Sequence, residues 1–261
     1  NSGTKTATFT VTKIVVGPDT DTVTVDVATG PGTAPSATVG TDYVALPLQT
    51  LTFLPGELTK IVTVTVNGDL IFESDETFFV NLSNPVNLTR PGFVNLGVDN
   101  HGIGTITNDD AAPVFTINDV TAVEGNSGTK TFTFTVTKTG PTALSSSVQY
   151  STANGTATAG SDYVAKGLTL LNFAAGTTLL SATVTVNGDT TDEPDETFFV
   201  NLSNPINATI GDGQGIGTIT NDDTTALSIT NASGAEGNTG TTDLVFTVTL
   251  SNPSASPVTV H

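Results

Sequence analysis

The sequence predicts an all-β protein made of tandem antiparallel β-sandwiches. Thr accounts for 53 of the 261 residues, which favours strands because β-branched side chains pack well on a pleated sheet. Gly (26 residues) and Pro (13 residues) supply turns between short strands. Apolar and polar residues alternate strictly in 131–137, which is the period of a strand with one buried and one solvated face.

Seven strand-like segments follow one another between residues 111 and 223. Turn signals such as Asn-Gly at 154–155 and Asn-Pro at 204–205 separate them. Seven short strands in about 113 residues are typical of an antiparallel sandwich. We therefore expect strands at 114–118, 131–138, 148–151, 168–173, 182–187, 197–202 and 217–220.

Two long motifs repeat along the chain and define its organisation. The segment 75–85 returns unchanged as 195–205, 120 residues later, whereas 102–110 returns as 215–223, 113 residues later. The two spacings differ because the first copy carries insertions. We expect one insertion between Lys13 and Thr41 and another around Arg90 to Asp99.

The repeats divide the chain into three parts. Residues 1–110 are predicted to form a repeat that lacks its first strand, 111–223 a complete repeat, and 224–261 the beginning of a third. We interpret the chain as a fragment of a longer array. The links between repeats are only about three residues long, so neighbouring repeats should touch rather than hang on a flexible tether.

Charge and composition exclude several classes of protein. A net charge of −18 with a single Arg argues against a nucleic-acid partner, and no apolar run approaches the roughly 20 residues of a membrane span, so this segment should not insert into a membrane. Cys is absent, which removes disulfides and thiolate sites. We expect no enzyme, because no nucleophile elbow, suitably placed His or aromatic sugar cleft is visible.

Acidic residues gather at four connections of the complete repeat. They are Glu124, Asp162, the run 189–196 and the pair 222–223, and in the predicted sandwich all four connections can meet at one end. Clustered carboxylates repel, at roughly 3 kcal/mol for a pair about 5 Å apart, and a hard cation removes that cost. Loops rich in Asp, Asn and Gly suit Ca²⁺ better than Mg²⁺. The alternative is that these loops are solvated turns that keep the protein soluble.

The same motifs carry a family resemblance. Glu124-Gly, then 160–163 (Gly-Ser-Asp-Tyr), then Asp189 with the acidic run to Phe198, then 219–223 (Ile-Thr-Asn-Asp-Asp) resemble the Calx-β repeat, over the whole chain. That family includes regulatory domains of sodium–calcium exchangers and repeats of bacterial surface proteins, and the resemblance here is to the bacterial extracellular type. It implies a seven-stranded immunoglobulin-like (Greek-key) sandwich with Ca²⁺ at the tip where the chain leaves the repeat.

Carried over position by position, the resemblance implies a ligand set for each repeat. In the second repeat the carboxylates would be Glu124, Asp162, Asp189, Glu193, Glu196, Asp222 and Asp223, with the carbonyl of Thr191. In the first they would be Asp42, Asp69, Glu73, Glu76, Asp109 and Asp110, with the carbonyl of Ile71. The third part offers Glu236.

This chain departs from the family's high-affinity members, which carry longer Asp runs. It has Asn67-Gly-Asp69 and Asn187-Gly-Asp189 before the acidic loops, and its closing runs begin with Asn108 and Asn221. Fewer charges imply fewer ions and weaker binding. We expect one or two ions per repeat at the weak end, with Kd about 10⁻⁴–10⁻³ M, as in extracellular modules.

These observations predict a calcium-binding structural or adhesive array of an extracellular or cell-surface protein. Its partners would be neighbouring repeats, and possible further partners are identical chains in a filament or a surface polysaccharide or protein. One alternative is a polysaccharide- or protein-binding module without structural calcium, for which the sequence offers little beyond Phe93. Another is a cytosolic regulator of the exchanger type, which would call for denser Asp runs.

Overall fold

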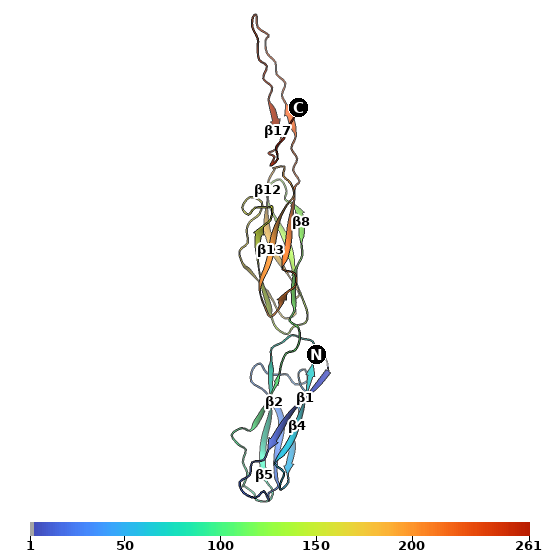
Figure 1. Cartoon of the computed structure of the whole chain (residues 1–261), viewed down its shortest axis with the longest axis vertical. Coiled ribbons are helices and arrows are strands. Elements are labelled where there is room, and N and C mark those ends of the chain that lie inside the picture. The colour runs from blue at the N-terminus through green and yellow to red at the C-terminus, as the bar shows by residue number, and fades with distance from the viewer. Residues whose placement is uncertain (1–2) are drawn as a thin grey trace. The chain divides into compact units, whose positions relative to one another are not determined.

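The computed structural model describes residues 3–261, and Asn1 and Ser2 of the repeated Asn-Ser-Gly-Thr motif lie outside it. Two compact units are present (Figure 1), Asn1–Ala112 with Pro141–Leu144, and Pro113–Gly140 with Ser145–His261. The regular structure of the described residues is β-strand, and no helix there is long and apolar enough to cross a membrane. The all-β prediction is confirmed.

Unit 2 contains a sandwich of a five-stranded and a four-stranded sheet, and all seven expected strands are present. The first sheet has the order β11 (Thr169–Phe173), β10 (Ser146–Asn154), β13 (Glu196–Ile206), β15 (Gln214–Thr220) and β8 (Val120–Val123). The second has the order β12 (Leu179–Gly188), β9 (Gly128–Thr139), β7 (Val114–Ile117) and β14 (Thr209–Ile210).

Strands β8 and β14 were not predicted, and both pair in parallel, β8 with β15 and β14 with β7. The first strand of the repeat therefore splits and changes sheets between β7 and β8. The split falls at Asn118 and Asp119. The side chains of these two residues accept hydrogen bonds from backbone amides of neighbouring strands. Asn118 Oδ1 accepts from the Thr135 amide, and Asp119 Oδ1 accepts from the Ile216 amide.

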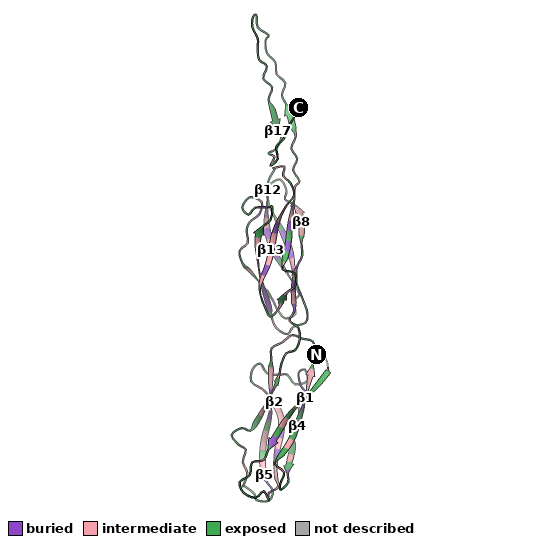
Figure 2. Cartoon of the chain, in the orientation of Figure 1, coloured by how far each residue is buried: buried purple, intermediate pink, exposed green. Residues whose placement is uncertain are grey.

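The core of unit 2 lies between the sheets and is aromatic. Phe198 is fully buried, and Tyr163 stacks on its ring with centroids 4.7 Å apart. Phe132 and Phe134 pack against the same ring. The first Phe of the repeated Thr-Phe-Phe motif therefore lies in the core of the sandwich. Figure 2 shows the buried residues along these strands.

The second glycine of the repeated Gly-Ile-Gly motif makes room for that ring. A Cβ added at Gly217 would lie 2.3 Å from Phe198 Cζ. Gly217→Ala is therefore expected to lower the free energy of unfolding by about 1–3 kcal/mol, the usual cost of overpacking. The matched control is Gly176→Ala, which meets nothing within 4 Å and should be neutral or slightly stabilising. Urea unfolding measures both, and equal midpoints would show that the packing does not depend on this glycine.

Unit 1 repeats this sandwich with fewer strands. One sheet has the order β3 (Gln49–Phe53), β2 (Val23–Pro31), β5 (Glu76–Asn87) and β6 (His101–Ile106). The other consists of β1 (Gly3–Thr12) and β4 (Thr59–Gly68). Tyr43 stacks on Phe78 with centroids 4.6 Å apart, as Tyr163 does on Phe198.

The two insertions predicted for the first repeat meet in unit 1. Arg90 and Asn87, on one side, bind the carboxylate of Asp21 on the other. The Leu88 amide donates to the Thr22 carbonyl at 2.9 Å. The insertions are therefore one structural feature, although 69 residues separate Asp21 from Arg90.

The third part of the chain contributes two short strands to unit 2. β16 (Leu227–Ile229) and β17 (Val248–Leu250) pair with each other in antiparallel register, and every residue of both is exposed. The identity of 224–261 as the start of a third repeat stays a prediction, since these strands do not form a sandwich among the described residues.

Candidate metal centre

The acidic residues of each repeat are positioned by short loops with internal hydrogen bonds. Asp162 Oδ2 accepts from the Thr158 amide at 2.6 Å, and Asp42 Oδ2 accepts from the Thr38 amide at 2.5 Å. Each aspartate thus closes a tight turn just before the buried Tyr163 or Tyr43. Because these tyrosines pack in the core, the aspartates are held at fixed points beside it.

The Asn residues that interrupt the acidic runs clamp two loops together. Asn187 Nδ2 donates to the carbonyls of Gly160 and Ser161 at 3.2 and 2.7 Å. Asn67 makes the same pair of bonds in unit 1, to Gly40 and Thr41. From the sequence, an Asn at these two positions implied only that the site has one negative charge fewer. In the structure, its side-chain amide joins the acidic loop to the loop that carries Asp162 or Asp42.

The acidic loop begins with an aspartate turn. Asp189 Oδ1 accepts from the Thr191 amide at 2.6 Å, and Asp69 Oδ1 accepts from the Ile71 amide at 2.7 Å. The turn orders the backbone that carries the Thr191 and Ile71 carbonyls. Their role as ligands stays a prediction.

The closing run is tied to the loop by its first residue. Asn221 Nδ2 donates to the Asp223 carbonyl at 2.9 Å, and the Asn221 amide donates to Asp195 Oδ1 at 3.0 Å. Asn108 repeats both bonds in unit 1, with Asp110 and Asp75. Asp75 and Asp195 therefore act as structural acceptors, which distinguishes them from the neighbouring glutamates of the same run.

In unit 2 the segment after β8 completes the site. The Gly125 amide donates to Asp222 Oδ1 at 3.1 Å, and Asn126 Nδ2 donates to Asp223 Oδ1 at 2.6 Å. These bonds hold Glu124, which is only 5% exposed, beside the closing run. Asn126 was not among the expected site residues, although its position in the repeated Glu-Gly-Asn motif is a signal that could have suggested it.

Three groups of carboxylates result, and within each group oxygens lie within 4.8 Å of one another. They are Asp42 with Asp69 and Glu73, Glu124 with Asp222 and Asp223, and Asp162 with Glu193 and Glu196. Nine of the residues implied by the family resemblance are thus brought together. Among the residues that the structure describes, unit 1 holds one group and unit 2 holds two.

The remaining expected residues differ in how closely they approach the three carboxylate groups. Asp42 acts electrostatically on Glu76, Asp189 acts on Glu124 and Glu193, and Asp110 acts on Glu73. Asp109 forms an ion pair with Lys5 at 3.4 Å. Glu236 is exposed and belongs to none of the three groups.

The electrostatics show carboxylates under mutual repulsion. Burial, followed by the charge of Glu193 and its acidic neighbours, raises the pKa of Glu124 from 4.5 to about 7. Burial and Asp162 raise the pKa of Glu196 to about 7, and burial and Asp42 do the same for Glu76. Burial and nearby carboxylates also raise the pKa values of Glu73 and Glu193.

Two buried oxygens at these groups have no hydrogen-bond partner, Glu76 Oε2 and Asp223 Oδ2. A buried carboxylate oxygen without a partner is costly. All-oxygen groups of this kind fit a hard divalent cation, which would satisfy these oxygens and remove the repulsion.

The raised pKa values predict that the calcium-free protein loses stability as pH rises. The folded state holds protons on Glu124 and Glu196 between their ordinary pKa of 4.5 and their folded pKa of about 7, where the unfolded chain has lost them. The resulting stabilisation is complete below 4.5 and is lost as pH rises through 7.

Urea unfolding in calcium-free buffer at about pH 5.5 and about pH 8 measures this difference. We expect the higher midpoint at the lower pH, and Glu124→Gln with Glu196→Gln should flatten the dependence. Asp19 and Asp21, whose pKa values ion pairs lower below 3.8, titrate outside this window. A midpoint that rises toward pH 8 would contradict the assignment.

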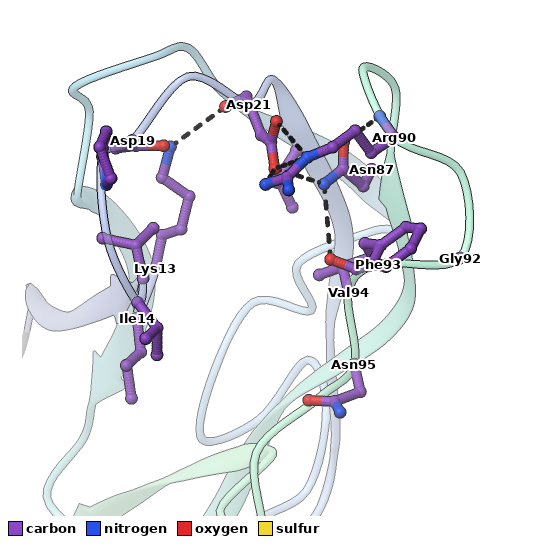
Figure 3. Close-up of a pocket in the computed structure, with 14 residues that line it drawn as sticks. Lys13, Ile14, Asp19, Asp21, Asn87, Arg90, Gly92, Phe93, Val94 and Asn95 are labelled. Carbon is purple, nitrogen blue, oxygen red and sulfur yellow. Dashed lines mark hydrogen bonds and ion pairs between the residues drawn. The ribbon is translucent and has the colours of Figure 1, made fainter.

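A second candidate site is the cleft of about 390 Å³ that the two insertions line in unit 1 (Figure 3). Its cations are already paired: Lys13 Nζ lies 2.6 Å from Asp19 Oδ2, and Arg90 Nε lies 2.9 Å from both oxygens of Asp21. The Arg90 guanidinium also lies over the ring of Phe93, which is 75% exposed. The charged groups therefore hold the insertions together, and the exposed Phe93 ring is what the cleft offers a partner.

Comparison with known proteins identifies related chains. The model of the Calx-beta domain matches residues 1–111 and 108–229. Sodium/calcium exchanger 1 of Rattus norvegicus is 32% identical over 199 residues, 71% of this chain and 20% of the exchanger. Extracellular matrix organizing protein FRAS1 of Homo sapiens is 30% identical over 168 residues, 62% of this chain and 4% of that protein. The chain therefore spans about a fifth of the exchangers, and these relatives give no support to a bacterial type.

Two solved structures are also similar to this chain. The apo form of the Calx CBD1 domain is 28% identical, covers 43% of this chain and 99% of its own, and has a TM-score of 0.40. CBD12 from CALX1.2 is 21% identical, covers 82% of this chain and 93% of its own, and has a TM-score of 0.37.

The family model finds two Calx-beta domains in the chain, and Calx-beta domains are calcium-binding modules, which agrees with the ion expected from the sequence. The matched segments together extend over residues 1–229, well over half of the sequence. The chain belongs to the Calx-beta domain family, with two such domains in tandem.

Proposed function

We propose that the chain is a calcium-binding segment of a structural or adhesive array outside the cell. Its carboxylate groups would hold Ca²⁺ at the end of each repeat, next to the link to the following repeat. The single observation that carries the proposal is that an acidic loop holding these carboxylates also forms backbone hydrogen bonds with residues of the predicted following repeat.

Inside unit 2, the contact is made at Asp192, between the predicted ligands Thr191 and Glu193. The Asp192 amide donates to the Pro253 carbonyl at 3.0 Å, and the Ala255 amide donates to the Asp192 carbonyl at 3.1 Å. The Asp192 carboxylate accepts from the Thr225 amide at 3.2 Å. Asp192 was not among the expected site residues, and a Phe at the equivalent position of the first repeat gave no signal for it.

Inside unit 1, the equivalent loop makes the same kind of contact at Phe72. Its amide donates to the Pro141 carbonyl at 3.2 Å, and its carbonyl accepts from the Ala143 amide at 3.1 Å. The acidic loops of the two units therefore make the same pair of backbone hydrogen bonds, although their sequences differ. We infer that ordering the loop by a bound cation stiffens the link between repeats, as nearest-neighbour coupling in a repeat array requires.

An extracellular location belongs to this proposal. Weak sites fill only where calcium is abundant, and a matrix-organizing protein is among the relatives, although a sodium/calcium exchanger is another. The partners would be neighbouring repeats, with identical chains or a surface polysaccharide or protein as further candidates. No catalytic role is part of the proposal.

Amide hydrogen exchange tests the coupling between loop and link. With Ca²⁺ present, exchange at the Asp192 and Ala255 amides is expected to slow, because ordering the acidic loop stabilises their hydrogen bonds. The control is the Thr177 amide, which donates to the Ala174 carbonyl at 3.0 Å in a turn outside the acidic loop. If calcium binds while all three amides exchange as before, the site has no role in stiffening the link.

A further inference from the structure

Strand β12 is an edge strand of the complete repeat. It ends the four-stranded sheet of unit 2 and pairs with β9 alone (Figure 1). The part of β12 near Thr185 is covered, because the Val164 amide donates to the Thr185 carbonyl at 2.8 Å. Along residues 179–183, no strand or bridge of the described chain pairs with the free side of β12. This stretch is therefore an open sheet edge in the middle of the sequence.

The backbone groups of every second residue point to this free side. The Thr185 carbonyl accepts its bond there, and the Asn187 amide donates there to the Asp162 carbonyl at 2.9 Å. Because a strand repeats every two residues, the odd-numbered residues of 179–183 present their N–H and C=O groups in the same direction. A row of such groups is the template to which another strand adds.

Unit 1 protects the equivalent edge, whereas unit 2 does not. Strand β4 precedes β12 by 120 residues and carries Lys60 on the same face as the buried Val62. An inward-pointing charge on an edge strand opposes pairing with another chain, and Lys60 also forms an ion pair with Glu57 at 2.9 Å. In unit 2 these two charged positions are Leu180 and Thr177. The edge of β12 therefore lacks the charges that block the edge of β4.

The edge of unit 2 is apolar and free of carboxylates. Leu179 is 56% exposed, and Leu168 and Leu170, at the adjoining β11, are 62% and 51% exposed. Residues 163–188 contain no Asp or Glu, in a chain that has 25 of them and a net charge of −18. Two copies of so acidic a chain repel each other, and the repulsion is weakest where each presents this edge. A basic partner would instead be attracted to the acidic loops, so a second copy is the partner that this edge fits.

We propose that β12 of unit 2 pairs with β12 of a second copy, antiparallel and about a two-fold axis at Ser181. Ser181 then lies opposite Ser181 of the second copy, and Leu179 lies opposite Thr183. The two four-stranded sheets become one continuous sheet, with backbone pairing as the source of affinity. Because both copies use the same surface, the contact closes at a dimer. It needs no metal and so goes beyond the proposed calcium function.

Sedimentation of the full chain tests the pairing. The wild type is expected to pass from monomer to dimer with rising concentration, and to do so more readily at high salt, which screens the repulsion. Leu180→Lys, which gives β12 the residue found at the unit 1 edge, should abolish the dimer although it makes the net charge less negative. The matched control is Thr121→Lys, which adds the same charge at an exposed residue of β8, the edge strand of the other sheet. It should leave the dimer intact.

Disulfide formation gives an independent readout of the register, since the chain has no Cys of its own. Opposed residues of antiparallel strands have the Cα separation that a disulfide needs. Ser181→Cys, at an exposed position, is therefore expected to give a covalent dimer under mild oxidation, and Thr121→Cys should give several-fold less. Equal crosslinking of the two variants, a monomer up to the highest soluble concentration, or species that keep growing beyond the dimer would overturn the proposal.

The tests separate this inference from the proposed calcium function. The dimer is expected to persist in excess chelator, since its backbone pairing and apolar contacts need no metal. If the chain stays monomeric but Ca²⁺ slows amide exchange at Asp192 and Ala255, only the dimer is wrong. If the Ser181→Cys dimer forms and Ca²⁺ leaves those amides unchanged, only the calcium function fails.

Discussion

Adding Ca²⁺ to the chain is expected to raise its midpoint of thermal unfolding by several degrees. At about 10 mM Ca²⁺ and a Kd of about 10⁻⁴–10⁻³ M, ligand linkage stabilises the folded state by about 1.4–2.7 kcal/mol per site. Asp162→Asn with Glu193→Gln should abolish most of the gain in unit 2, because these carboxylates belong to one group. In chelator the same variant should be slightly more stable than wild type, since repulsion is relieved.

The matched control is Asp212→Asn, an exposed aspartate of unit 2 outside the three groups. It removes the same kind of charge and should leave the calcium response intact. A control that loses the response as completely as the site variant would mean that calcium acts through overall charge, and the groups would then be solvated acidic loops.

Phe198→Ala is expected to destabilise the second domain by about 3–5 kcal/mol, the cost of removing a large side chain from a well-packed core. The Phe198 ring contacts Phe132, Phe134 and Tyr163. Since Tyr163 directly follows Asp162, the cavity should also loosen the turn that holds this carboxylate. Denaturant unfolding gives the stability, and calcium titration of the folded variant gives the second effect.

Phe199→Ala provides the comparison for this prediction. Phe199 is the next residue of β13, points to the opposite face of the sheet and is only half-buried. Its removal should cost clearly less, and it should leave calcium binding unchanged. Equal losses of stability for the two variants would show that the sheet face next to Tyr163 is not the core on which the site depends.

The strands could be predicted because their signal is local. Alternation with period two marks 131–137 and 183–186 without knowledge of what they pack against. Strands β8 and β14 were not predicted from the sequence, because each has at most four residues and its pairing partner lies about 95 residues away in sequence. The meeting of the two insertions escaped for the same reason, since it depends on contacts such as Asp21 with Arg90.

The site was partly predictable for a related reason. Repetition and family resemblance pointed to the carboxylates, and nine of them lie in three groups. Neither the repetition nor the family resemblance could tell which acidic side chains of a run belong to the carboxylate groups and which have another role. Asp195 is used as a backbone acceptor and Asp192 as a contact to the following repeat, whereas Glu193 and Glu196 face Asp162. That distinction depends on loop geometry.

Equilibrium dialysis against radioactive calcium tests the central claim, that the carboxylate groups bind Ca²⁺. At about 0.15 M salt, where long-range attraction is screened, we expect saturable uptake of one or two ions per complete domain. Asp162→Asn with Glu193→Gln should reduce the uptake and Asp212→Asn should preserve it. Uptake that never saturates, or that is the same in all three proteins, would contradict a calcium-binding function for these groups.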